Sequence, residues 1–188
     1  MLRTLSFAVL ATALAGSAQA QTATSVPLPD EYFAMKAYCS GLAEISMSRL
    51  AEQKATDPEI KKFAAHMVKE HTACNGKIAK LANEKGIALP ASVDAVHTAA
   101  ISRMATLSGS DFDKHYMMAQ IGFHKDAIHL FEHEAHKGQD AGLKELAHKS
   151  VPDLMSHVKT AFELAGEKKE YEKYHKVMEY AKQVMNEK

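Results

Sequence analysis

The sequence predicts an all-α protein that folds as a four-helix bundle followed by a C-terminal tail helix. Its 188 residues are rich in Ala, Lys, Glu, Leu and Met and contain nine Gly, five Pro and no Trp, a composition typical of helical proteins. Apolar residues recur at alternating spacings of three and four in four long segments, as in the buried stripe of a bundle helix. Short turns follow the first and third segments, whereas a connection of roughly two dozen residues separates the second from the third.

The N-terminus has the pattern of a secretory signal peptide over residues 1–20. One early cation, Arg3, precedes a mostly apolar run over residues 5–15, and the small-residue motif Ala-Gln-Ala follows it. Cleavage is expected before Gln21, and a periplasmic location follows. The apolar run is too short for a mature membrane-spanning helix, and no other segment of the sequence predicts a membrane span.

The first predicted hairpin begins after a short extended lead. Asp30 is expected to cap a helix over residues 31–53, since Asp is a preferred N-cap. Thr56 or Asp57 is expected to cap the second helix. Gly86 ends that helix, because glycine readily adopts the left-handed conformation that closes a helix.

The second predicted hairpin follows the long connection, which contains a short helix near residues 93–104. Two long helices are expected over residues 111–138 and 141–165. Ferritin-like four-helix bundles have this connectivity, in which a long crossover joins two helical hairpins. The bundle domain is therefore predicted over residues 30–166, with a charged helical tail over residues 167–188.

Each predicted core stripe contains one residue that could bind a metal through a strong ligand atom. Counted from the two turns at about 1.5 Å per residue, the four positions lie at similar heights and could meet in mid-bundle. A carboxylate and three imidazoles suit Zn(II), Fe(II) or Cu(II), and their types alone do not choose among these ions. The alternative is a metal-free network in which the four groups satisfy one another. The four residues are Glu44, His71, His124 and His157.

A second histidine group follows His124 on the same helix but faces another direction. At about 100° per residue, its members lie roughly 120° to 180° from His124, on the flank or solvent side. Their helical spacing could form a surface metal site, or they could belong to an exposed face that is rich in histidine. The group comprises His129, Glu132, His133 and His136.

Cys39 and Cys74 are the two cysteines of the chain. Counted from the first turn they lie at the same height on adjacent helices, which favours a disulfide in an oxidising compartment. The alternative is a thiol-containing metal site, because Cys74 follows His71 by three residues.

Four segments resemble a bacterial family of ferritin-like proteins, whose members are described as outer-membrane or periplasmic proteins with a domain of unknown function. They are "GLAEISMSRLA", "IKKFAAHMVKEH", "GFHKDA" and "PDLMSH", which contain Glu44, His71, His124 and His157. The resemblance implies a four-helix bundle and export, but no reaction. The Glu-x-x-His pairs of di-iron carboxylate proteins are absent, because Val68, Ile121 and Leu154 stand three residues before the histidines.

The expected function is metal storage, metal buffering or protection against envelope stress through the four-ligand site. A metal-free envelope interaction protein is the alternative, and an enzyme that uses the same metal is a third possibility. Four protein ligands would leave little room for substrate, which favours binding over catalysis. Equal numbers of basic and acidic residues, 23 of each, give no reason to expect nucleic acid or an anionic membrane as partner. A homo-oligomer is compatible with the sequence.

Overall fold

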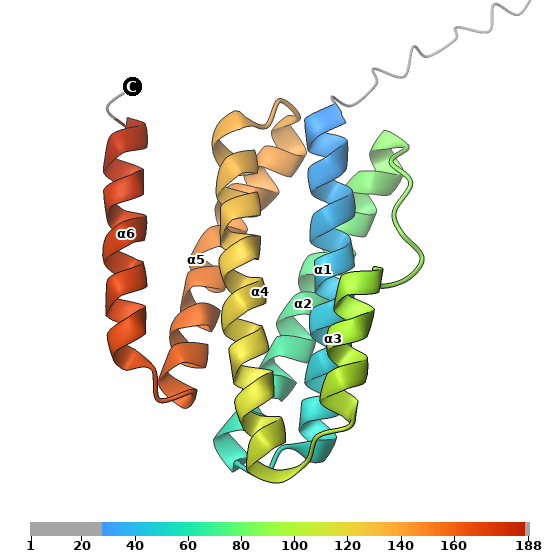
Figure 1. Ribbon diagram of the computed structural model, residues 1–188. Helices are drawn as coiled ribbons and strands as arrows, with labels where there is room; N and C mark the ends of the chain where they lie inside the picture. Colours follow the sequence, from blue (N-terminus) through green and yellow to red (C-terminus); the bar gives the residue numbers. More distant parts are fainter. Residues whose placement is uncertain (1–27, 187–188) are drawn as a thin grey trace, which may run out of the picture.

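The computed structural model describes residues 28–186, and within them the chain forms six α-helices and no strand. The predicted signal peptide over residues 1–20 lies outside this range. The helices are α1 (Leu28–Lys54), α2 (Pro58–Lys85), α3 (Ala95–Ala105), α4 (Gly109–Lys137), α5 (Ala141–Leu164) and α6 (Lys168–Asn186) (Figure 1).

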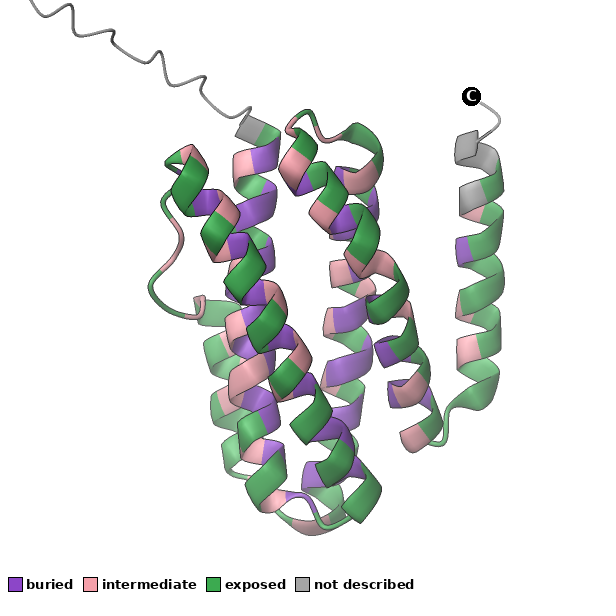
Figure 2. Cartoon of the chain, turned by 180° about the vertical axis from the view of Figure 1, so that it is seen from behind, coloured by how far each residue is buried: buried purple, intermediate pink, exposed green. Residues whose placement is uncertain are grey.

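The helices α1, α2, α4 and α5 form a bundle. Within it α1 packs against α2 and α4, and α5 packs against α4 and α2. The short crossover helix α3 lies against α1 and α4, and α6 packs on α5. Buried residues face the inside of the bundle, while α6 is mostly exposed (Figure 2). None of the six described helices combines the length and apolarity that crossing a membrane requires.

Apolar side chains from both hairpins fill the bundle and fix the distance between the hairpins. Phe33 of α1 meets Phe131 of α4 edge to face, with ring centroids 5.0 Å apart. Such aromatic pairs contribute roughly 0.5–1.5 kcal/mol beyond the area they bury. Buried polar groups also pair between the same helices, as in the case of the Ser48 and Tyr116 hydroxyls, which lie 2.9 Å apart.

In the first hairpin, α2 begins and ends where the sequence predicts. Asp57 is the N-cap of α2, and its carboxylate accepts a hydrogen bond of 2.8 Å from Glu59 N. Gly86 follows α2 with φ of 69°, in the left-handed region where a side chain would be strained.

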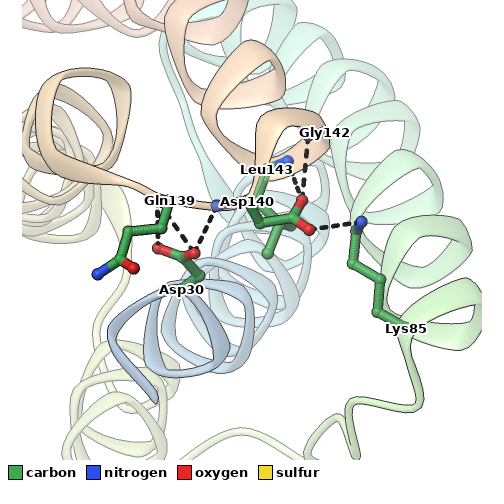
Figure 3. A network of polar contacts seen from close by, with 6 residues as sticks. All are labelled: Asp30, Lys85, Gln139, Asp140, Gly142 and Leu143. Carbon is green, nitrogen blue, oxygen red and sulfur yellow. Dashed lines mark hydrogen bonds and ion pairs between the residues drawn. The ribbon is translucent and has the colours of Figure 1, made fainter. Parts of the chain in front are cut away.

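The predicted N-cap role of Asp30 is wrong, because α1 begins two residues earlier, at Leu28. The buried carboxylate of Asp30 instead accepts backbone N–H bonds from Gln139 (3.1 Å) and Asp140 (2.7 Å) in the turn between α4 and α5 (Figure 3). Asp140 in turn caps α5 and pairs with Lys85 of α2 at 2.7 Å. One end of α1 is therefore tied to the opposite hairpin.

Asp113 of α4 ties the two hairpins together at the other end of the bundle. Its carboxylate accepts N–H bonds of 3.0 Å from Thr56 and Asp57, in the turn between α1 and α2. Each hairpin turn is thus held by a buried carboxylate from the first helix of the other hairpin. These ties fix the register of the two hairpins, and with it the height of the side chains in the middle of the bundle.

Candidate metal centre

Three histidines from three helices meet inside the bundle. His71 of α2, His124 of α4 and His157 of α5 are 9%, 1% and 6% exposed. Their ring centroids form a triangle with sides of 5.4 Å (His71–His124), 5.4 Å (His124–His157) and 5.9 Å (His71–His157). One ring nitrogen of each lies within 4.8 Å of those of the other two.

The group has buried polar atoms without hydrogen-bond partners in the protein. They are Nε2 of His71, Nε2 of His124, Nδ1 of His157 and Oε1 of Glu44. A buried polar atom without a partner costs roughly 1–3 kcal/mol, so four in one place are unfavourable for the protein alone. A metal ion uses the same lone pairs as ligands, and the chemistry of this donor set therefore fits a transition metal.

The backbone of α4 sets which nitrogen of His124 is free. His124 Nδ1 lies 2.9 Å from the carbonyl oxygen of Gln120, and a carbonyl can only accept, so Nδ1 carries the proton. The lone pair of the neutral ring is then on Nε2. A ligand histidine in a metal site is commonly oriented by such a bond from its other nitrogen to a carbonyl.

Glu44 of α1, the fourth predicted ligand, lies beside the three histidines. Its Oε1 is 3.8 Å from His124 Nδ1, but no oxygen of Glu44 completes the set of mutual distances below 4.8 Å. Its Oε2 accepts a hydrogen bond of 2.5 Å from Gln120 Nε2. The structure thus brings three of the four predicted residues into mutual reach and places the fourth at the edge of the group.

Burial keeps all four groups in their neutral forms. It lowers the pKa of His71 to about 3, with a further contribution from the charge of His157, and the pKa of His157 to about 4, with a contribution from His66. Burial also drives the pKa of His124 well below its usual value. The pKa of Glu44 rises to about 8, again through burial and against the hydrogen bond from Gln120. The imidazoles therefore have the unprotonated form that a metal requires.

Two further residues lie at this site that the sequence pattern did not predict. Gln120 is fully buried but lies on the flank of the apolar stripe of α4. His66 is exposed, and its ring lies 5.3 Å from that of His157 in an edge-to-face contact. Helical spacing does not single out His66, because a residue five positions before His71 lies roughly 140° away around the helix.

A small cavity of about 70 Å³ adjoins the histidines within the bundle. His71, His157 and Cys74 line it, together with the carboxylates of Glu70 and Asp153. A space of this volume is large enough to hold water. The cavity gives His71 and His157 a polar side from which an ion could approach.

The predicted disulfide is absent from the structure, where Cys39 and Cys74 are free. The Cys39 thiol donates to the Ser92 carbonyl, before α3, whereas Cys74 lines the cavity and interacts with Ser150 of α5. Axial counting gave the height of the two residues but not the rotation of their helices, which directs the side chains to different neighbours. The structure does not group the Cys74 thiol with the three histidines as donors in mutual reach.

The predicted surface group on α4 is not brought together. Its three histidines, His129, His133 and His136, are exposed, while Glu132 is 9% exposed. Among the described residues, neither of the two groups with donor atoms in mutual reach includes any of these four.

The fold and the site define an all-helical bundle protein with a buried histidine cluster. The chain belongs to the DUF4142 family, a domain of unknown function whose pattern matches residues 13–164. The predicted resemblance to a family with a domain of unknown function is confirmed to that extent. Comparison with curated proteins gave no match.

Solved structures share the fold at low sequence identity. A DUF305 fragment from Deinococcus radiodurans has a TM-score of 0.68 and 10% identity, over 76% of this chain and 98% of that one. A DUF305 protein from Streptomyces coelicolor has a TM-score of 0.64 and 18% identity, over 74% and 92%. CopM in its Cu(I)-bound form has a TM-score of 0.61 and 17% identity, over 71% and 93%.

Proposed function

We propose that this chain is an exported, ferritin-like helical bundle that binds one transition-metal ion between His71, His124 and His157. Glu44 releases its proton when the ion binds and acts as the fourth ligand or as a charge beside the ion. The role is metal storage, buffering or protection against envelope stress. The observation that carries the proposal is the set of four buried ligand atoms without hydrogen-bond partners. A resident metal would satisfy the three histidine nitrogens at once, and it would also satisfy Glu44 Oε1 where Glu44 moves in as the fourth ligand.

Copper is the first ion to test. CopM, which shares the fold, has been solved with Cu(I), Cu(II) and silver. The donor set of three imidazoles and one carboxylate suits Cu(II) and also Zn(II) or Fe(II), so the three ions should be compared on the same protein.

The test is metal binding by untagged protein, because a His-tag would supply competing imidazoles. We expect one ion per chain at the buried histidines, and His71→Gln or His157→Gln to weaken its binding about tenfold or more. His148→Gln, at an exposed position of α5, is the matched control and should leave affinity unchanged. Equal affinity in His148→Gln and His157→Gln would refute the site.

A metal-free envelope interaction protein is the alternative function. It is favoured by the hydrogen bonds of Gln120, which satisfy one oxygen of Glu44 and one nitrogen of His124 without any ion. In that case Glu44→Gln and His157→Gln would change the stability of the fold without changing metal affinity. Export itself is tested by cell fractionation and N-terminal sequencing, with a mature chain starting at Gln21 as the expected result.

A further inference from the structure

A second group of ligand side chains lies outside the bundle interior, between α1 and the crossover. It consists of Cys39 of α1 with Asp94 and His97, at the start of α3. One donor atom from each lies within 4.8 Å of those of the other two. The group combines a thiol, an imidazole and a carboxylate, which are the three common protein ligands of Zn(II).

Two of the three side chains are held in place by local structure. Asp94 is the N-cap of α3, and its Oδ1 accepts the backbone N–H of His97 at 3.0 Å. The same oxygen lies 2.8 Å from His97 Nδ1, and the imidazole packs on the Phe123 ring with centroids 4.7 Å apart. Helix capping explains this pair, but it does not explain why a thiol should face them.

The thiol of Cys39 is buried and weakly bonded. Cys39 is 6% exposed, and the hydrogen bond that its Sγ donates to the Ser92 carbonyl is 4.0 Å long. Its sulfur lies within 4.8 Å of a donor atom of Asp94 and of His97. The nearest competing cation is the exposed Lys36, whose Nζ lies 4.0 Å from Asp94 Oδ2, a distance at which a flexible lysine is readily displaced.

An open groove gives access from solvent to Asp94 and His97 of this group. It has a volume of about 320 Å³, and its charged and histidine lining consists of Asp94, His97, Asp126 and Lys36. The two carboxylates outnumber the one lysine, which favours the approach of a cation, and the groove has room for a water molecule as a fourth ligand.

We propose that Cys39, Asp94 and His97 bind a thiophilic transition-metal ion of the Zn(II) type, which fastens the crossover helix α3 to α1. Two ligand atoms of a tetrahedral ion with bonds of about 2.0 Å lie roughly 3.3 Å apart, so the Asp94–His97 pair needs only a small shift. Binding would displace the thiol proton to solvent. The proposal does not depend on the buried histidines, which include no sulfur.

The test uses Co(II) as a spectroscopic substitute for Zn(II), on the full chain kept reduced. A thiolate ligand gives Co(II) an intense sulfur-to-metal charge-transfer absorption that imidazole and carboxylate do not give. We expect this band to appear on titration, to be lost in Cys39→Ser and to persist in Cys74→Ser, which removes the other cysteine. His97→Gln should weaken binding about tenfold or more.

Asp94→Asn separates a ligand role from a folding role, because Asn is as good an N-cap as Asp. It should keep the helical circular dichroism of the parent and weaken Co(II) binding. Zn(II) should raise the thermal midpoint of the parent more than that of the correctly folded Cys39→Ser. A band that persists in Cys39→Ser, is lost in Cys74→Ser, or never appears on the folded parent would overturn the proposal.

Discussion

The side-chain amide of Gln120 on α4 donates a hydrogen bond of 2.5 Å to Glu44 Oε2 on α1. Both residues are buried, at 0% and 2% exposed. The bond joins the first helix of one hairpin to the first helix of the other, next to His124. It orients the Glu44 carboxyl so that Oε2 is satisfied while Oε1 remains without a partner.

Replacing one partner of this bond should cost more than replacing both. We expect Gln120→Leu to destabilise the metal-free protein by about 1–3 kcal/mol, because Glu44 would stay buried without a donor. The double variant Glu44→Leu, Gln120→Leu should recover most of that loss, since two apolar groups need no partner. Urea unfolding of the parent, both single variants and the double variant measures the coupling. Additive effects would contradict the proposed dependence of Glu44 on Gln120.

The three histidines could be predicted from the sequence because helical periodicity fixes the face and a short turn fixes the height. Gln120 could not, because it lies on the flank of the α4 stripe. Gln120 is buried because α1 approaches closely, and the residue pattern of α4 alone does not show how closely a neighbouring helix lies. The same limit explains why the disulfide prediction failed. The Cys39 thiol faces Ser92, and the rotation of α1 that directs it there depends on packing with several helices. The approach of Cys39 to Asp94 and His97 also depends on the packing of helices, so the pattern of a single helix does not predict it.

Gly41 allows α1 and α2 to approach closely at the level of Asn75. A Cβ at Gly41 would lie 2.0 Å from Asn75 Oδ1, and Asn75 cannot move freely because it is buried and donates to the Tyr38 carbonyl at 3.1 Å. We expect Gly41→Ala to destabilise the fold by about 1–3 kcal/mol, measured by thermal or urea unfolding.

Gly122, an exposed helical glycine of α4, is the matched control. A Cβ there would meet nothing within 4 Å, so Gly122→Ala should stabilise the helix by about 0.5–1 kcal/mol. In the Gly41→Ala background, Asn75→Ala should relieve the overlap. If Gly41→Ala were as stabilising as Gly122→Ala, the close approach would not constrain the fold.

Glu134 should make the protein less stable as the pH rises from about 4.5 to about 7. Burial, with the nearby charges of Asp30 and Asp140, raises the pKa of this carboxyl to about 7, above its ordinary value of 4.5. The folded state therefore holds a proton that the unfolded state has lost. The resulting stability is full below pH 4.5 and is lost as the pH rises through 7.

The size of this effect is limited by the position of Glu134. Although the residue is 2% exposed, it lies near the end of the bundle, so we expect about 1 kcal/mol after screening by water. Glu134→Gln should remove this pH dependence and be more stable than the parent at pH 8 but not at pH 4. Unfolding curves at both pH values measure it, and an equal gain at both would show that the carboxyl charge is not the cause.

His66 should control how fast a metal reaches the buried histidines. It is exposed on α2 with its ring 5.3 Å from that of His157, and the carboxylates of Glu70 and Asp153 line the cavity beside His157. An ion captured at His66 could therefore pass to His157 by a short movement. We expect His66→Gln to slow metal association on the order of threefold to tenfold, within the range over which association rates vary among variants.

Equilibrium binding distinguishes this role of His66 from that of a ligand. Because His66 lies outside the buried group, His66→Gln should slow association and dissociation together and leave the affinity nearly unchanged. His157→Gln should instead lower the affinity, and His148→Gln should change neither quantity. Stopped-flow mixing with Cu(II), combined with equilibrium titration of the same variants, measures both. An affinity loss in His66→Gln equal to that in His157→Gln would make His66 a ligand, and an unchanged association rate would exclude it from the entry path.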